Sequence, residues 1–155
     1  MSLALAAILS LAVSWSDDWK RVPPEVAAAA WGLASDHLAS GGLELIWVKD
    51  SEVVVFVLPL DDPSILGMVS PKRSTSIWLF PDPILRWGHA DLKEAYARLI
   101  VHEVLHTIGC HHGPAVMKAQ LDPAPWSAED TEVVRACVAG VYKWRDPSQF
   151  RRQPI

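Results

Sequence analysis

The sequence has little positive charge, few cysteines and no long hydrophobic run. Among 155 residues, 14 lysines and arginines stand against 18 aspartates and glutamates, which gives a net charge of −4. A nucleic-acid-binding surface needs an excess of positive charge, so we expect no nucleic-acid partner. No apolar stretch reaches the roughly 18 residues of a membrane-spanning helix, so we expect no integral membrane span. Length and composition indicate one domain with its own core.

The two cysteines, Cys110 and Cys137, do not settle the compartment. In an exported protein, a disulfide could tie the segment around Cys110 to the C-terminal region. Two small buried thiols are the alternative, and the sequence leaves both open.

The first apolar run, Leu3 to Val13, has the length of the core of a secretory signal. Small residues near its end, such as Ser14, suit a cleavage site, but no lysine or arginine precedes the run. A helix end or tail that packs on the domain is the alternative. We expect residues 1–14 to be a signal peptide or apolar leader, residues 15–155 to form a single domain, and the protein to be extracellular or exported.

The remaining sequence predicts a helix, several strands and two further helices. Prolines before and glycines after an alanine-rich stretch predict the first helix, over residues 23–42. Four segments rich in β-branched and aromatic residues predict strands, at 43–48, 52–58, 65–70 and 75–80. Capping-box spacing predicts the starts of the later helices, at Asp91 with Glu94 and at Ser127 with Asp130. This order indicates an α+β domain.

The middle of these three helices, which runs to Gly109, is apolar over most of its circumference and is therefore expected to be buried. In its second half the polar side chains share one arc of the helix: His102, Glu103, His106 and Thr107. His102 and His106 are four residues apart, so both imidazoles lie on one face and can reach one metal ion.

A catalytic zinc ion usually has three protein ligands and one water, so two histidines do not complete the site. Gly109 can adopt left-handed dihedral angles at little cost, which lets the chain turn back sharply after the helix. His112 follows three residues later and is placed to return as the third ligand. The pattern is HExxHxxGxxH, which fixes five positions in eleven. We expect His102, His106 and His112 to bind one zinc ion.

This extended motif resembles that of the metzincin zinc metalloproteases, and the matrixin-like group most closely. The resemblance implies that Met117 forms the methionine turn beneath the metal. It also implies a metzincin-like fold: an N-terminal helix, a twisted, mostly parallel sheet of about four to five strands with one antiparallel edge strand, an active-site helix and a C-terminal helix. The similarity is strongest around the histidines and weaker over the rest of residues 23–142.

The predicted function is that of a zinc-dependent endopeptidase acting on protein or peptide substrates, with residues 15–155 as its catalytic domain. Glu103 would take the proton of a zinc-bound water as general base. The substrate would pair through its backbone along residues 66–70.

No His/Asp-rich loop is present for further ions, so calcium is not indicated. The short link from His112 to Met117 and the absence of an aromatic residue after Met117 depart from the matrixin pattern. We expect a monomer.

Two other interpretations remain open. The first is a non-catalytic zinc-binding structural or interaction domain, in which Cys110 or His111 completes the coordination. Glu103 argues against it, since metal binding alone needs no carboxylate there. The second is a gluzincin-like site, in which Glu129 or Glu132 of the last helix is the third ligand.

Overall fold

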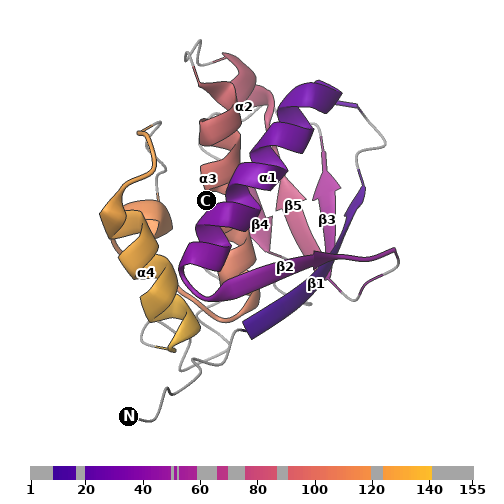
Figure 1. The fold of residues 1–155 in the computed structure, drawn as a ribbon. Helices are drawn as coiled ribbons and strands as arrows, with labels where there is room; N and C mark the ends of the chain where they lie inside the picture. Colours follow the sequence, from indigo (N-terminus) through magenta and orange to yellow (C-terminus); the bar gives the residue numbers. More distant parts are fainter. Residues whose placement is uncertain are drawn as a thin grey trace, which may run out of the picture.

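The structure is a computed structural model that describes residues 9–16, 20–49, 51, 53–58, 66–69, 76–86, 91–119 and 124–140. Within these residues, five strands and four α-helices are arranged as a sheet with helices packed against it (Figure 1). In chain order the elements are β1 Leu9–Ser16, α1 Pro24–Ser40, β2 Leu43–Trp47, β3 Val53–Val57, β4 Gly67–Val69, β5 Ser76–Leu79, α2 Asp82–Arg86, α3 Leu92–Thr107, the 3-10 turn η1 Ala115–Met117 and α4 Ala128–Val138. None of the helices described is long and apolar enough to cross a membrane.

The strands lie in the order β2-β1-β3-β5-β4. The first four, β2, β1, β3 and β5, are parallel to one another. β4 pairs antiparallel with β5, with Gly67 opposite Leu79, and forms one edge of the sheet. The α+β class and a mostly parallel sheet of about four to five strands are thus as predicted.

β1 was not predicted as a strand. It lies in the middle of the sheet, where Leu9 pairs with Leu43 of β2 and Ser16 pairs with Phe56 of β3. The boundary that we expected after residue 14 therefore falls inside a central strand, while residues 1–8 lie outside the described ranges. A short apolar run is compatible with a signal core and with a buried strand, and its periodicity does not separate them.

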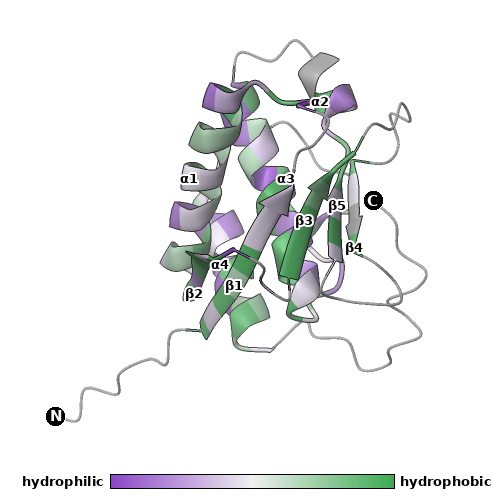
Figure 2. Ribbon diagram, turned by 90° about the vertical axis from the view of Figure 1, so that its right-hand side faces the viewer, coloured by the Kyte–Doolittle hydropathy of each residue, from purple (hydrophilic) through white to green (hydrophobic). Residues whose placement is uncertain are grey.

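α1 and α3 pack against each other on the same side of the sheet (Figure 2). The strand β3 is hydrophobic along its whole length, as expected for a strand inside a sheet that is covered by helices (Figure 2). The interior is formed by fully buried aliphatic side chains from helix and sheet, among them Leu38, Ile77, Leu79, Leu99 and Leu105. Every residue of α3 from Ala95 to His106 is buried, which confirms that this helix lies inside the domain.

α4 is fixed to α3 by a buried ion pair. Arg98 Nη1 lies 2.6 Å from Asp130 Oδ2, and both side chains are almost fully buried. The same aspartate forms the predicted capping box with Ser127 at the start of α4. At the start of α3, the Asp91 side chain accepts from the backbone N–H of Glu94, and the Glu94 carboxylate contacts His37. These contacts fix α3, the helix that carries the histidines, at Glu94 near its start and at Arg98 near its middle.

Candidate metal centre

His102 and His106 lie one turn apart on α3, and their Nε2 atoms are 3.0 Å apart. Both side chains are buried in the interior of the domain. Two nitrogen ligands on one tetrahedral zinc ion stand about 3.3 Å apart, as follows from zinc–nitrogen distances of about 2.0–2.1 Å. The spacing of the two imidazoles therefore suits a shared metal ion.

Backbone carbonyl groups orient both rings. His102 Nδ1 lies 2.7 Å from the carbonyl oxygen of Val116, and His106 Nδ1 lies 2.6 Å from that of Cys110. A carbonyl oxygen can only accept, so each Nδ1 carries a proton and donates it. In the neutral rings the two Nε2 atoms then bear lone pairs that face each other. A cation between these atoms would relieve their repulsion, which is the arrangement found at histidine metal sites.

Burial keeps these imidazoles neutral. It lowers the pKa of His102 well below its ordinary value, and the neighbouring His106 lowers it further. Burial lowers the pKa of His106 to about 4, although its hydrogen bond to Cys110 opposes the shift. Burial and the nearby His111 also lower the pKa of His112. Since zinc binds neutral imidazole, all three shifts favour metal binding at neutral pH.

The chain turns back after α3 as the sequence predicts. Gly109 has a φ of +90°, and the amide of Cys110 donates to the carbonyl oxygen of Leu105 over 3.1 Å. This turn brings His112 beside the other two histidines, with ring centroids 5.3 Å from His102 and 5.0 Å from His106. One nitrogen from each of the three rings lies within 4.8 Å of the others. Within the described ranges, His112 Nε2 is buried and has no hydrogen-bond partner. The three residues fit a zinc ion.

Met117 lies at the end of η1, five residues after His112. It is fully buried, and its carbonyl oxygen accepts from the amide of Gly113 over 2.9 Å, which closes the loop. The preceding residue, Val116, supplies the carbonyl oxygen that orients His102. The segment expected as a methionine turn thus supports the centre through its backbone.

Glu103 is fully buried, and neither of its carboxylate oxygens has a hydrogen-bond partner among the described residues. Burial raises the pKa of this carboxyl well above its ordinary value. Glu103 follows His102 directly on α3, and a buried carboxyl with a raised pKa suits a group that accepts and releases a proton during a reaction.

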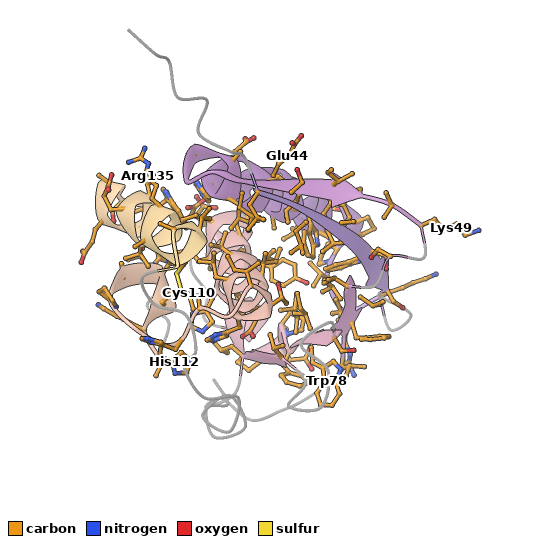
Figure 3. The ribbon with its side chains drawn as sticks, turned by 90° about the horizontal axis from the view of Figure 1, so that it is seen from below. Glu44, Lys49, Trp78, Cys110, His112 and Arg135 are labelled. Carbon is orange, nitrogen blue, oxygen red and sulfur yellow. A yellow bond between two sulfur atoms is a disulfide. The ribbon has the colours of Figure 1, made fainter. Side chains whose placement is uncertain are left out.

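The two cysteines form a disulfide, Cys110–Cys137, which joins the loop after α3 to α4. Figure 3 shows Cys110 close to His112 on this side of the molecule. The sequence left open whether these cysteines form a disulfide or are two buried thiols, and in the structure they form the disulfide. Cys110 is therefore not a metal ligand in this state, although its carbonyl group orients His106.

The alternative ligands are not part of this cluster of three histidines. Glu129 and Glu132 are exposed on α4, and Glu132 pairs with Arg135, which projects outward from the helix away from His112 (Figure 3). The Nδ1 atom of His111 contacts the carbonyl oxygen of His112 over 2.7 Å. The structure therefore brings together His102, His106 and His112, which are the three ligands predicted from the sequence.

Sequence reasoning missed the carbonyl groups of Cys110 and Val116, because every residue carries a carbonyl and no side chain marks the ones that matter. It also gave no role to His37. This histidine lies 2.9 Å from a Glu94 oxygen and stacks on Trp126 with ring centroids 3.9 Å apart. Its contacts join α1, α3 and the segment before α4, so they are structural.

Comparison with known proteins shows similarity in structure. No family model matches the chain, and no curated protein matches it in sequence. Among solved structures, the chain is similar to archaemetzincin from Methanopyrus kandleri, with a TM-score of 0.57 and 12% sequence identity. The match covers 89% of this chain and 99% of the archaemetzincin chain. At this identity the likeness concerns the fold, and it agrees with the metzincin-like α+β architecture expected from the sequence.

Proposed function

We propose that the protein is a zinc-dependent endopeptidase of the metzincin type. One observation carries the proposal: the Nε2 atoms of His102 and His106 lie 3.0 Å apart while both Nδ1 atoms donate to carbonyl groups. His112 adds a third buried nitrogen that lacks a protein partner among the described residues. Three neutral imidazoles are the ligand set of a catalytic zinc ion, which keeps its fourth position for water.

When bound, zinc would supply a water of lowered pKa and would polarise the scissile carbonyl group. His102, His106 and His112 would hold the ion, and the carbonyl groups of Val116 and Cys110 would fix two of the rings. Glu103 would accept the water's proton at its carboxylate and pass it to the leaving amine nitrogen. Burial raises the pKa of Glu103, which suits this role, since a carboxyl with a raised pKa holds the transferred proton more readily.

The proposed substrate is a protein or peptide in extended conformation. β4 is an edge strand that pairs with β5 on one side, and it packs against α3, which carries the histidines. An extended peptide could add to this edge through backbone hydrogen bonds. Of the segment that we expected to bind substrate, residues 66–69 are described and Ser70 lies outside the described ranges. We propose that the protein acts as a monomer.

Two finer proposals have different support. The metzincin class is supported by the histidine motif and by a structural neighbour whose name belongs to that class. The matrixin-like assignment rests on the sequence: the histidine motif, Met117 and a weaker similarity over the rest of residues 23–142. We also propose that the protein is exported. The Cys110–Cys137 disulfide supports this, because such bonds persist in oxidising compartments.

The experiment is cleavage of a mixed quenched-peptide library by zinc-loaded wild type, Glu103→Ala and Glu132→Ala. Glu132 is a matched control, since it is an exposed glutamate whose side chain lies on α4. We expect turnover by the wild type and by Glu132→Ala, and none by Glu103→Ala or after addition of a chelator. Cleavage by Glu103→Ala would remove this residue from the mechanism. An inactive wild type with zinc firmly bound would favour the non-catalytic zinc domain instead.

A further inference from the structure

Gly67 of β4 lies directly against the side chain of Glu103. A Cβ atom on residue 67 would lie 2.5 Å from Oε1, 2.8 Å from Cδ and 2.9 Å from Cγ of Glu103. All three distances are shorter than van der Waals contact between these atoms. The carboxylate of Glu103 therefore occupies the space that any other residue at position 67 would fill with its side chain.

Backbone conformation does not explain a glycine at this position. The glycines with positive φ among the described residues are Gly42, Gly109 and Gly140. Gly67 instead lies in a regular antiparallel pairing, opposite Leu79. Glycine weakens a strand interior, and it often marks a place where another group approaches closely. Here the group that approaches is the carboxylate.

We propose that Gly67 is a positioning residue for Glu103, because its missing side chain fixes where the carboxylate lies. Glu103 is fully buried and its oxygens have no hydrogen-bond donor among the described residues. Packing therefore has to hold the carboxylate in place. A side chain at position 67 would displace the carboxylate or separate β4 from α3. The catalytic part of this inference rests on the proposed function.

The first test is the kinetics of Gly67→Ala in the full chain. Misplacing a catalytic group by about 1 Å can cost up to about a hundredfold in rate, so we expect kcat to fall by at least tenfold. KM and the zinc content should stay close to those of the wild type. Gly32→Ala is the matched control, because it lies on α1 and a Cβ at this position meets nothing within 4 Å. The control should keep kcat within about twofold of the wild type, as is usual for changes that touch nothing.

The second test is a double-mutant cycle on thermal stability, which does not depend on peptidase activity. Gly67→Ala should lower the melting temperature of the metal-free protein when Glu103 is present. The same substitution should leave the melting temperature unchanged in a Glu103→Ala background, because the space is then open. Gly41→Ala provides a contrast, since its Cβ would meet Val134 and not Glu103. It should lower the melting temperature equally in both backgrounds.

The two tests separate the contact from its catalytic consequence. Equal destabilisation by Gly67→Ala in both backgrounds would overturn the proposal, and so would a Gly67→Ala enzyme as active as Gly32→Ala. If the wild type cleaves no peptide, the proposed function fails. The stability cycle then still decides whether Gly67 makes room for Glu103.

Discussion

His106 is oriented by Cys110: its Nδ1 atom lies 2.6 Å from the carbonyl oxygen of that residue. Cys110 is in turn bonded to Cys137 on α4. The disulfide therefore connects α4 to Cys110, the residue whose carbonyl group fixes the tautomer of the proposed zinc ligand His106. Partners that orient a metal ligand in this way contribute to metal affinity as well as to ligand geometry.

Replacing both cysteines by alanine should therefore affect stability and zinc binding together. The disulfide joins residues separated by 27 positions, and its loss should lower the free energy of unfolding by about 3 kcal/mol. Zinc affinity should fall by about tenfold, the usual lower bound for losing support around a metal ligand. Chemical unfolding and competition with a chelating dye measure the two effects. Unchanged zinc affinity in a destabilised variant would show that the Cys110 carbonyl group stays in place without the disulfide.

Substituting His111 and His112 one at a time tests which of these two neighbouring residues is the third zinc ligand. His112→Ala should weaken zinc binding by more than about a hundredfold, because it removes a ligand and not merely a partner of one. His111→Ala should have a much smaller effect, since His111 is outside the cluster of three nitrogens. The measurement is the zinc dissociation constant of each variant. The opposite ranking would identify His111 as the third ligand.

The local part of the site could be predicted because helix geometry determines it. The spacing of His102 and His106 places both on one face, and Gly109 has the positive φ that the turn requires. The contacts that hold the site are long-range. Gly67 and Glu103 meet only because β4 packs against α3, and no spacing along the chain shows this.

The fold could be predicted where a pattern had one interpretation. Helix α4 begins at the predicted cap, Ser127, and its capping box forms with Asp130. β1 could not be predicted, because an apolar run of its length matches a signal core equally well. Pairing with β2 and β3 makes it a strand, and that pairing depends on segments far along the chain.

The metal-free protein should lose stability in acid. Burial lowers the pKa of His106 to about 4 from an ordinary value of 6.5, so the folded state keeps this ring neutral. Below pH 6.5 the unfolded chain binds a proton that the folded protein does not, and stability falls. The stabilising contribution is fully present above pH 6.5 and is lost as the pH falls toward 4. Urea unfolding of metal-free protein at pH 7.5, 6 and 5 measures it.

Two comparisons check that the histidines cause this loss. His106→Gln cannot gain the proton, so its stability should depend less on pH than that of the wild type between pH 7.5 and 5. Zinc-loaded wild type should lose still more stability over this range, because protons compete with zinc for the same nitrogens. Burial raises the pKa of Glu103, which acts in the opposite direction, so the comparison with His106→Gln is the decisive one. A metal-free wild type whose stability depends on pH no more than that of His106→Gln would contradict the proposed neutrality of the His106 ring.

Removal of residues 1–14 should prevent the domain from folding, because the deletion removes most of β1. Val13 is fully buried in this strand. The deletion removes every residue of β1 that pairs with β2, and it removes Val13 and Ser14 from the pairing with β3. A chain that begins at Leu9 is the matched control, since it keeps the whole strand. We expect the control to unfold cooperatively and to bind zinc, and the chain that begins at Trp15 to do neither. Circular dichroism on heating and zinc titration distinguish them. If the shorter chain folds and binds zinc as tightly as the control, β1 is dispensable and residues 1–14 are free to act as a leader.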